Sequence, residues 1–374
     1  MPKRAEVFHL ERADDASEAI HRAAQRLSQG GIVAFPTETV YGLAASVLRP
    51  EAVERLQSVK GRAKDKPLAL ALDAPAAVLQ HFPGIGRLGR RLSRRCWPGP
   101  VTLVFPSPGN DLLSRLSESV RAAVAPESSV GIRVPAHPVV AAVIRQLGAP
   151  LALTSANRSN QPDATTGPEV VETFGDEIEL IVDDGPSRYG QPSTVVEVHD
   201  DHWRILREGV VNESTMRRLA SCLVLFVCTG NTCRSPMAEA LARKLLAEQV
   251  GCRPEELDQH CYIVMSAGIA AGLGTRPAPE AIEVAREFSV RVDDHLSQPL
   301  TRQLLEQADY IFPMTRGHLE AILVQCPEAA PRTRLLSPDG QDIADPLGGG
   351  ADDYRRCARQ IEENLRKVLP EIKP

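Results

Sequence analysis

The sequence predicts two α/β-type domains in one chain, and three observations lead to this expectation. The length of 374 residues exceeds the roughly 100 to 200 residues that one domain usually takes. Through the first part of the chain, short runs typical of β-strands alternate with stretches typical of helices. At residues 222–227 an abrupt apolar run, CLVLFV, then opens a second series of strand, loop and helix.

The strand-like runs of the first part indicate an α/β or α+β domain with a sizeable sheet. They are GIVAF (31–35), PLALAL (67–72), VTLVF (101–105), PLALT (150–154) and STVVEV (193–198). A short polar segment, NESTMRRLAS, separates the last of these elements from the apolar run at 222–227. We therefore expect a boundary near residue 218, with one domain over 7–215 and the other over 220–370.

Composition and charge narrow the class of protein. Hydrophobic residues make up 43% of the chain and charged residues 24%, which is typical of globular proteins. The net charge of -5 comes entirely from the residues after 219, so neither part is a polybasic nucleic-acid binder by bulk charge. The cysteines cluster in the second part at spacings typical of neither a zinc ribbon nor a disulfide framework. The N-terminus is charged and no apolar run is long enough to cross a membrane, so we expect a cytoplasmic protein without a resident metal.

A phosphate-binding loop is predicted directly after the apolar run of the second part. Cys228 and Arg234 are separated by five residues, between a buried-type strand and an amphipathic helix. Backbone N–H groups at a helix N-terminus form a positive pocket that stabilises both a phosphate and a thiolate. Arg234 would grip two phosphate oxygens, and Asp345, before a proline and three glycines, would protonate the leaving group. The loop residues are Thr229, Gly230, Asn231, Thr232, Cys233 and Ser235, of which Asn231 and Ser235 are expected to orient the loop.

With CTGNTCRSP and the distant Asp-Pro, residues 222–369 resemble the low-molecular-weight protein tyrosine phosphatases. The resemblance implies a doubly wound parallel sheet, a cysteinyl-phosphate intermediate and a phosphoprotein substrate. Thr232 is typical of the branch that acts on phosphoarginine, although that branch usually has an aromatic residue where Leu347 stands, so phosphoarginine and phosphotyrosine both stay open. Cys233 is either a small loop residue or a resolving cysteine for Cys228 under oxidation.

A row of cations in the first part predicts a triphosphate site. Lys60, Arg62, Lys64 and Lys66 alternate before a strand, so an extended segment would point several of them the same way. An ordinary solvated loop is the alternative. The chain has no Walker-type phosphate loop, so any nucleotide site must be built differently.

The first part also resembles the YrdC/Sua5 family of threonylcarbamoyl-AMP synthases over roughly residues 7–215. The resemblance rests on the cation row and on PTETVYGL, WPGPVTLVF, VGIRVPAHP, ALTSANRSNQPDATT, STVVEV and ILREG in that order. It implies a twisted mixed sheet and the condensation of L-threonine, bicarbonate and ATP, with Mg²⁺, into an adenylate. A separate threonylcarbamoyl transferase complex would then modify tRNA.

The same resemblance implies a role for each site residue. Lys60, Arg62, Lys64 and Arg207 would bind ATP, and Thr37 and Arg133 would contact threonine. Ser155 and Asn157 would hold the carbamate or bicarbonate, with Ser193 near the threonine. The alternatives are that Ser155 and Asn157 cap the following turn and that Arg133 makes a surface salt bridge.

Two further features leave alternatives open. The helix-like segment 86–96 carries Arg87, Arg90, Arg91, Arg94 and Arg95 at helical spacing, which predicts one basic stripe. The stripe is either a solvated helix face or a contact with tRNA phosphates or a partner enzyme. The competing functions for the first domain are carbamoyl transfer of the hydrogenase-maturation type and an RNA-binding or regulatory module attached to a working phosphatase.

Overall fold

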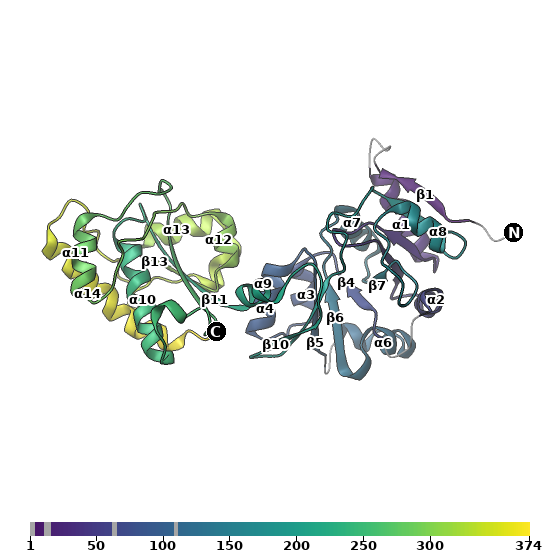
Figure 1. Cartoon of the computed structure of the whole chain (residues 1–374), viewed down its shortest axis with the longest axis horizontal. Coiled ribbons are helices and arrows are strands. Elements are labelled where there is room, and N and C mark those ends of the chain that lie inside the picture. Colours follow the sequence, from purple (N-terminus) through teal and green to yellow (C-terminus); the bar gives the residue numbers. More distant parts are fainter. Residues whose placement is uncertain (1–3, 11–15, 62–65, 108–110) are drawn as a thin grey trace. The chain divides into compact units, whose positions relative to one another are not determined.

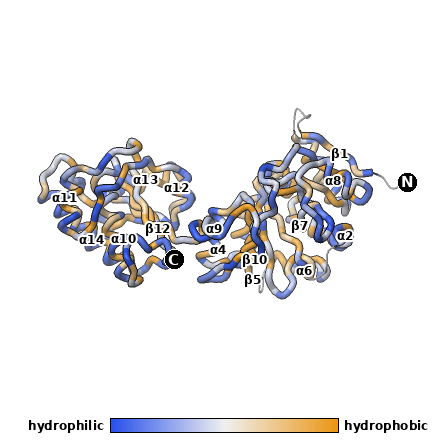
Figure 2. The backbone as a smooth tube through the Cα atoms, viewed as in Figure 1, coloured by the Kyte–Doolittle hydropathy of each residue, from blue (hydrophilic) through white to orange (hydrophobic). Residues whose placement is uncertain are grey.

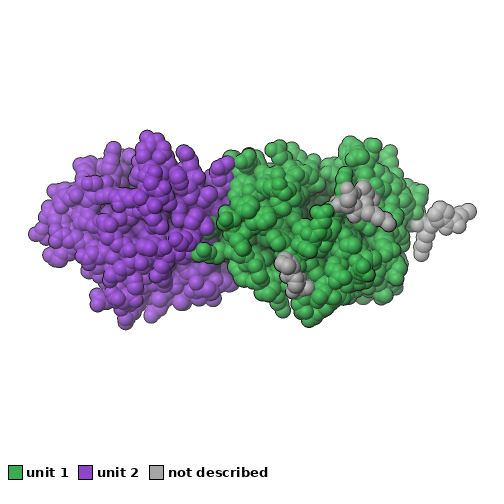
Figure 3. All heavy atoms as spheres, turned by 90° about the horizontal axis from the view of Figure 1, so that it is seen from below, with its two compact units in different colours: residues 1–216 green, residues 217–374 purple. Residues whose placement is uncertain are grey.

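The computed structural model of the chain describes residues 4–10, 16–61, 66–107 and 111–374. They divide into two compact units, Met1–Met216 and Arg217–Pro374, which Figure 3 colours separately. In each unit hydrophobic segments lie along the strands, as around β12, whereas a connecting helix such as α9 is hydrophilic (Figure 2). The units are described separately below.

Unit 1 contains one mixed sheet, as the sequence predicted (Figure 1). The strand order in the described residues is β1-β8-β2-β3-β7-β4-β6-β5-β9-β10. The β1/β8, β2/β8, β4/β6 and β5/β9 pairs are parallel and the others antiparallel. The strands are β1 (Glu6–His9), β2 (Val33–Phe35), β3 (Gly42–Ser46), β4 (Ala69–Ala71), β5 (Val101–Pro106), β6 (Ser129–Arg133), β7 (Leu151–Ser155), β8 (Leu180–Asp183), β9 (Thr194–Val198) and β10 (Trp203–Arg207).

The helices of unit 1 cover this sheet, and α1 and α7 pack on the part formed by β2, β3, β7 and β8. Their small and branched side chains, among them Ala19, Ala23, Val140 and Val143, share one core cluster with those strands. The helices are α1 (Ser17–Ser28), α2 (Pro50–Lys60), α3 (Pro75–His81), α4 (Arg87–Cys96), α5 (Asp111–Ser114), α6 (Glu118–Val124), α7 (Pro138–Leu147), α8 (Gly167–Phe174) and α9 (Glu213–Ala220), and the last contains the junction to unit 2.

Unit 2 is a three-stranded parallel sheet with helices on both faces, as expected for a doubly wound fold. The strand order is β12-β11-β13, with bounds β11 (Cys222–Cys228), β12 (Tyr262–Gly268) and β13 (Tyr310–Pro313). The helices are α10 (Arg234–Val250), α11 (Pro279–Glu287), α12 (Arg302–Gln307), α13 (Arg316–Gln325) and α14 (Ala351–Val368).

Strand β11 is buried along its whole length because its side chains alternate between two cores. Val224 and Phe226 face the cluster formed with α10, α11 and α14, whereas Leu225 and Val227 face the cluster formed with α12 and α13. This alternation explains why the continuous apolar run forms a central strand. The strand ends at Cys228, at the carboxyl edge of the sheet, where ligands bind in open α/β folds.

Candidate active sites

The phosphate loop of unit 2 connects the end of β11 to the first residue of α10, so it lies at a helix N-terminus. Cys228 is buried, and its Sγ lies 2.9 Å from Oγ of Ser235. The backbone N–H of Asn231 donates to the same sulfur at 3.2 Å. Two groups are thus aimed at Cys228 Sγ, the atom that would carry the negative charge.

Asn231 fixes the loop in this shape from within the protein. Its φ of +56° lies in the left-handed region, where asparagine is tolerated better than most residues. Its side-chain amide donates at 2.9 Å to Oγ of Ser235 and at 2.9 Å to Oγ of Ser266 on β12, and its Oδ1 accepts from the backbone N–H of Gln298 at 2.9 Å. The sequence singled out Asn231 and Ser235 as residues that orient the loop, whereas Ser266 and Gln298 carry no local signal for such a role.

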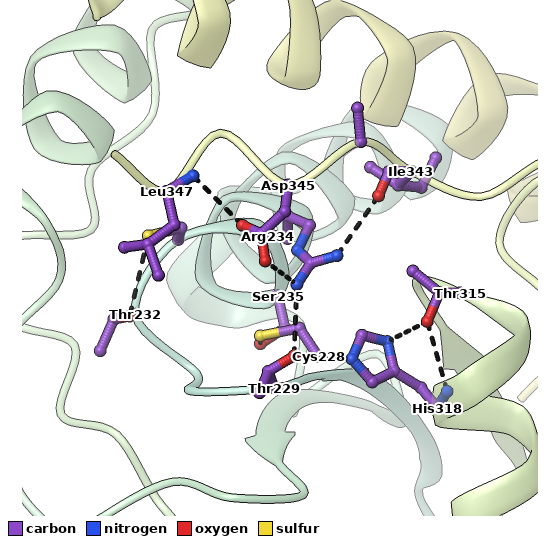
Figure 4. A network of polar contacts seen from close by, with 12 residues as sticks. Cys228, Thr229, Thr232, Arg234, Ser235, Thr315, His318, Ile343, Asp345 and Leu347 are labelled. Carbon is purple, nitrogen blue, oxygen red and sulfur yellow. Dashed lines mark hydrogen bonds and ion pairs between the residues drawn. The ribbon is translucent and has the colours of Figure 1, made fainter. Parts of the chain in front are cut away.

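The structure brings Arg234 and Asp345 together across 111 positions of sequence. The Arg234 side chain is buried, its Nη2 pairs with Oδ2 of Asp345, and its Nη1 donates to the carbonyl of Ile343 at 3.3 Å (Figure 4). The Asp345 side chain keeps 44% of its surface exposed, so this carboxylate faces the mouth of the site. The backbone N–H of Leu347 donates to its Oδ1 at 3.2 Å.

His318 is a member of this cluster that sequence reasoning missed. It lies in the first turn of α13, and its Nε2 is 2.9 Å from Oγ1 of Thr229 in the loop. Burial, together with the nearby positive charge of Arg234, lowers the pKa of His318 from 6.5 to about 4. A single histidine without a motif around it gave no signal in the sequence, because the contact depends on how β13 and α13 approach the loop.

Exposed apolar side chains lie on the segment after β12 and directly after the Asp345-Pro346 pair. Leu273 is 84% exposed and Leu347 is 72% exposed, and Ile269 also lies in the open on the segment after β12. The backbone N–H of Ile269 donates to the carbonyl of Cys228 at 3.0 Å, which ties this segment to the loop. Thr232 is half-buried, whereas Cys233 is buried with its Sγ 3.3 Å from the hydroxyl of Tyr354.

In unit 1 a cavity of about 570 Å³ is lined by five of the residues to which the family resemblance assigned a role. They are Thr37, Arg133, Ser155, Ser193 and Arg207, which come from five separate segments of the chain. The cavity has the size of an ordinary small-molecule site and mixes apolar walls with a few polar groups. Lys66 also lines it, whereas Arg62 and Lys64 lie outside the described residues.

Lys60 lies beside this cavity, but in a different conformation from the one predicted. It is the last residue of α2, and Gly61 ends the helix with a φ of +62°, so Lys60 does not belong to an extended row of cations. Its buried ammonium donates to the carbonyl of Ser155 at 2.6 Å, to Oγ of Ser155 at 3.0 Å, and to Oδ1 of Asn157. The physical reason is that the helical periodicity continues to position 60 and glycine supplies the left-handed cap.

Arg133 is buried and not a surface residue. Its Nη2 donates to Oε1 of Glu38 at 2.9 Å, to Oγ1 of Thr39 at 2.6 Å and to Oγ1 of Thr37 at 3.4 Å. Only 8% of the Arg133 side chain and 9% of the Glu38 side chain are exposed. The Nε atom of Arg133 is buried without a hydrogen-bond partner in the described structure. Glu38 and Thr39 were not singled out from the sequence, although both lie in the quoted PTETVYGL segment.

Arg207 and Ser193 meet on the far side of the same cavity. Nη2 of Arg207 donates to the carbonyl of Ser193 at 2.7 Å and to its hydroxyl at 3.2 Å. The hydroxyl of Thr102 on β5 lies 3.0 Å from that of Ser193. Desolvation lowers the pKa of Arg207, the carboxylate of Asp163 opposes this shift, and the charge of Arg133 acts in the same direction as desolvation. Arg133 and Arg207 both line the cavity and offer guanidinium groups suited to an anion.

The prediction that the five arginines of α4 form one basic stripe is wrong, because they do not share a continuous exposed face. Arg91 is buried, and Arg94 and Arg95 are half-buried, so only Arg87 and Arg90 stand in the open. Helical spacing alone placed the five side chains together, but α4 also buries Leu88 and Leu92 against the unit, and the wide buried face includes Arg91.

The described residues lack both a membrane-spanning helix and a group of potential metal ligands. No helix among them combines the length and the apolar character that crossing a membrane requires. Within the same ranges, no three or more His, Cys, Asp or Glu side chains are grouped so that they could hold a metal ion.

Comparison with known proteins gives a separate match for each unit. The Sua5/YciO/YrdC family, described as "Telomere recombination", matches residues 25–209, and the family of low molecular weight phosphotyrosine protein phosphatases matches residues 223–374. A solved structure of a Pyrococcus abyssi Sua5 variant is similar in fold, with a TM-score of 0.51 and 24% identity over 88% of this chain and 98% of that one.

Individual relatives agree with these matches. The threonylcarbamoyl-AMP synthase of Bacillus subtilis is 36% identical over 195 residues, which are 52% of this chain and 54% of that protein. The threonylcarbamoyl-AMP synthase of Bos taurus is 37% identical over 210 residues, which are 53% of this chain and 71% of that protein. The protein-arginine-phosphatase of Bacillus subtilis is 36% identical over 154 residues, which are 40% of this chain and 96% of that protein. The chain thus spans about half the length of the synthases of Bacillus subtilis and Pyrococcus abyssi that it matches.

Unit 1 therefore combines a mixed sheet, a cavity lined by Arg133 and Arg207 and a family match, and unit 2 combines a parallel sheet, a cysteine-arginine loop and a second family match. The chain belongs to the Sua5/YciO/YrdC family through its first unit and to the low-molecular-weight phosphotyrosine protein phosphatase family through its second.

Proposed function

We propose that residues 7–215 synthesise L-threonylcarbamoyladenylate from L-threonine, bicarbonate and ATP. The observation that supports this most is the cavity of about 570 Å³, in which Arg133, Ser155 and Arg207 converge. The threonine amine adds to bicarbonate-derived carbon dioxide, the carbamate oxygen attacks the α-phosphorus, and pyrophosphate leaves. Positioning and charge neutralisation then supply most of the rate.

Each described residue has a task that its contacts make reasonable. Arg133 receives the threonine carboxylate, since its Nε has no hydrogen-bond partner among the described residues and Glu38 already orients its Nη2. Lys60 holds Ser155 and Asn157 where the carbamate would lie. Arg207 neutralises phosphate charge and is itself oriented by Ser193. Thr37, which contacts Arg133, lies on the threonine side, and Arg62 and Lys64 are proposed as further triphosphate ligands.

Mg²⁺ fits this site as part of the ATP substrate. The described residues offer no cluster of three or more metal-ligating side chains, so the ion would be held mainly by phosphate oxygens and water. When bound, it would withdraw charge from the triphosphate. The protein's own residues would position the carbamate and shield the site from water.

The synthase proposal is tested by the fate of radiolabelled bicarbonate in a mixture with ATP and threonine. We expect label in an adenylate that contains threonine, and none when threonine is omitted. A Lys60→Met variant, similar in side-chain length, is expected to form little labelled product. If a folded wild-type protein forms no labelled adenylate, the proposal is overturned and an RNA-binding or regulatory role for this unit is favoured.

We further propose that residues 220–370 hydrolyse a phosphoprotein through a cysteinyl-phosphate. Cys228 Sγ attacks phosphorus while the bond to the leaving group breaks and that group takes a proton from Asp345. Water, deprotonated by Asp345, then attacks the phosphocysteine and releases phosphate and thiolate. Entry of phosphate would turn the Arg234 fork from Asp345 onto the phosphate oxygens, which frees the carboxyl group for its role as acid.

The substrate class that fits the mouth best is phosphoarginine. Leu347, whose backbone N–H donates to Asp345, is exposed and aliphatic, and a flat phosphotyrosine ring would gain more from an aromatic side chain there. The aliphatic stem of an arginine packs well against leucine. Thr232, half-buried in the loop, leaves more room than a larger aliphatic residue.

This specificity is measured with two peptides of one sequence, one with phosphoarginine and one with phosphotyrosine. We expect the ratio of kcat/KM values to favour phosphoarginine and to fall in a Thr232→Ile variant, whereas Thr232→Val, of similar size to threonine, changes it less. A ratio that favours phosphotyrosine in the wild type would contradict the assignment.

Release of the adenylate to a separate transferase complex for tRNA modification, in the cytoplasm, completes the proposed role of the chain.

A further inference from the structure

His318 is a buried histidine that the chemistry proposed above does not use. Only 4% of its surface is exposed, although it lies beside the phosphate loop. It sits in the first turn of α13, whose N-cap residue Thr315 accepts a hydrogen bond from the His318 backbone N–H at 3.3 Å. The Thr315 hydroxyl also lies 3.0 Å from Nδ1 of the ring, so one end of the imidazole is anchored to the helix start (Figure 4).

The other end of the ring contacts the loop. Nε2 of His318 lies 2.9 Å from Oγ1 of Thr229, the residue directly after Cys228. Nη2 of Arg234 donates to the same hydroxyl oxygen at 3.3 Å. Because a guanidinium can only donate, Thr229 accepts from Arg234, and its hydroxyl is shared between the arginine and the histidine. A continuous series of contacts therefore runs from Thr315 through His318 and Thr229 to Arg234.

We propose that His318 is a positioning residue for the phosphate loop, which fixes the Thr229 hydroxyl and through it the orientation of the Arg234 fork. The inference rests on the proposed phosphatase function of unit 2. It assigns no chemical step to His318, because the ring contacts neither Cys228 nor the described groups that would receive substrate. A neutral ring suits this role, since an imidazolium beside Arg234 would repel the guanidinium.

The geometry of the contacts supplies a matched pair of substitutions. The amide of an asparagine reaches about as far as Nδ1 of histidine, so His318→Asn keeps the contact with Thr315 and loses the one with Thr229. The amide of a glutamine reaches about as far as Nε2, so His318→Gln restores the contact with Thr229. Thr229→Val removes the hydroxyl with little change in shape.

The experiment measures hydrolysis of an aryl phosphate and inhibition by inorganic phosphate in the full-length chain. Both substitutions remove a contact that holds the Arg234 fork, so we expect His318→Asn and Thr229→Val each to lower kcat/KM by about tenfold or more. Phosphate should also inhibit both variants less well. The double variant should be no worse than the poorer single variant, and His318→Gln should recover most of the activity. Circular dichroism of each variant shows whether unit 2 is folded.

Two results would overturn the inference. One is a folded His318→Asn variant with the activity and phosphate inhibition of the wild type. The other is a pair of findings: the loss of kcat/KM in the double variant equals the product of the two single losses, and His318→Gln recovers no activity. Together they would indicate that His318 has a general packing role and no specific link to Thr229. A folded wild-type protein without any aryl-phosphate hydrolysis is a different result, since it refutes the phosphatase function and the inference falls with it.

Discussion

The buried pair of Glu38 and Arg133 allows a stability prediction whose size follows from the structure. Both side chains are less than a tenth exposed, and Glu38 also accepts the backbone N–H of Ala136 at 2.9 Å. A Glu38→Leu substitution leaves the Arg133 charge buried without its partner, which typically destabilises a protein by roughly 3 to 5 kcal/mol. Because the cavity admits water to Arg133, we expect the lower end, about 3 kcal/mol.

The assay is urea unfolding followed by tryptophan fluorescence. The chain has two tryptophans, Trp97 and Trp203, and both lie in unit 1, so the signal reports on that unit alone. With a urea dependence of about 2 kcal/mol per M, the midpoint should fall by roughly 1.5 M. The control is Asp111→Leu, which breaks an exposed pair with Arg115 and should change the stability by less than about 1 kcal/mol.

A second substitution separates lost charge pairing from lost packing. In the double variant Glu38→Leu/Arg133→Leu no unpaired charge remains, so part of the lost stability should return. The reasoning is refuted if Glu38→Leu unfolds at the same urea concentration as Asp111→Leu. Equal destabilisation by Glu38→Leu alone and in the double variant would place the effect in packing instead.

Three further predictions concern glycines and pH. In Gly268→Ala the new Cβ would lie 2.5 Å from the Thr229 carbonyl, so we expect at least about tenfold lower aryl-phosphate hydrolysis with an unchanged tryptophan transition. In Gly209→Ala the Cβ would lie 2.3 Å from the Pro192 carbonyl beside the cavity, so adenylate formation should fall while phosphatase activity stays constant. The pKa of His318 is about 4 in the folded protein against 6.5 when unperturbed, so the unfolded state binds more protons between these values. Unit 2 should therefore lose stability as pH falls from 6.5 towards 4, by at most about 3 kcal/mol and less where solvent screens the ring from Arg234, Asp345 and Asp342. The measurement is thermal unfolding followed by circular dichroism, in which the stability of His318→Asn should depend less on pH than that of the wild type. An equal pH dependence in the two proteins would contradict this.

The parts of the molecule that the sequence predicted are those with a local cause. The run at 222–227 is apolar at every position, which is typical of a central strand covered on both faces, and β11 is such a strand. The spacing of Cys228 and Arg234 fixes a short loop before a helix, and this loop is found there. Both predictions depend only on neighbouring residues.

The features that were missed depend on contacts between distant segments. Lys60 was expected in an extended row, but the outcome turned on whether α2 continued to that position before Gly61. The burial of Arg91 depends on how α4 packs, which helical spacing alone does not determine. Glu38 and His318 each bond to a residue more than 80 positions away, so nothing beside them in the sequence marked their roles.

The central claim is that the chain carries a threonine-dependent synthase and an independent cysteine phosphatase. The most direct test is pyrophosphate release by the purified chain with ATP, bicarbonate and Mg²⁺, with and without L-threonine, in wild type, Lys60→Ala and Cys228→Ser. The account predicts release that requires threonine, is lost in Lys60→Ala and is unchanged in Cys228→Ser. No threonine-dependent release from a wild-type protein that still hydrolyses an aryl phosphate would contradict it.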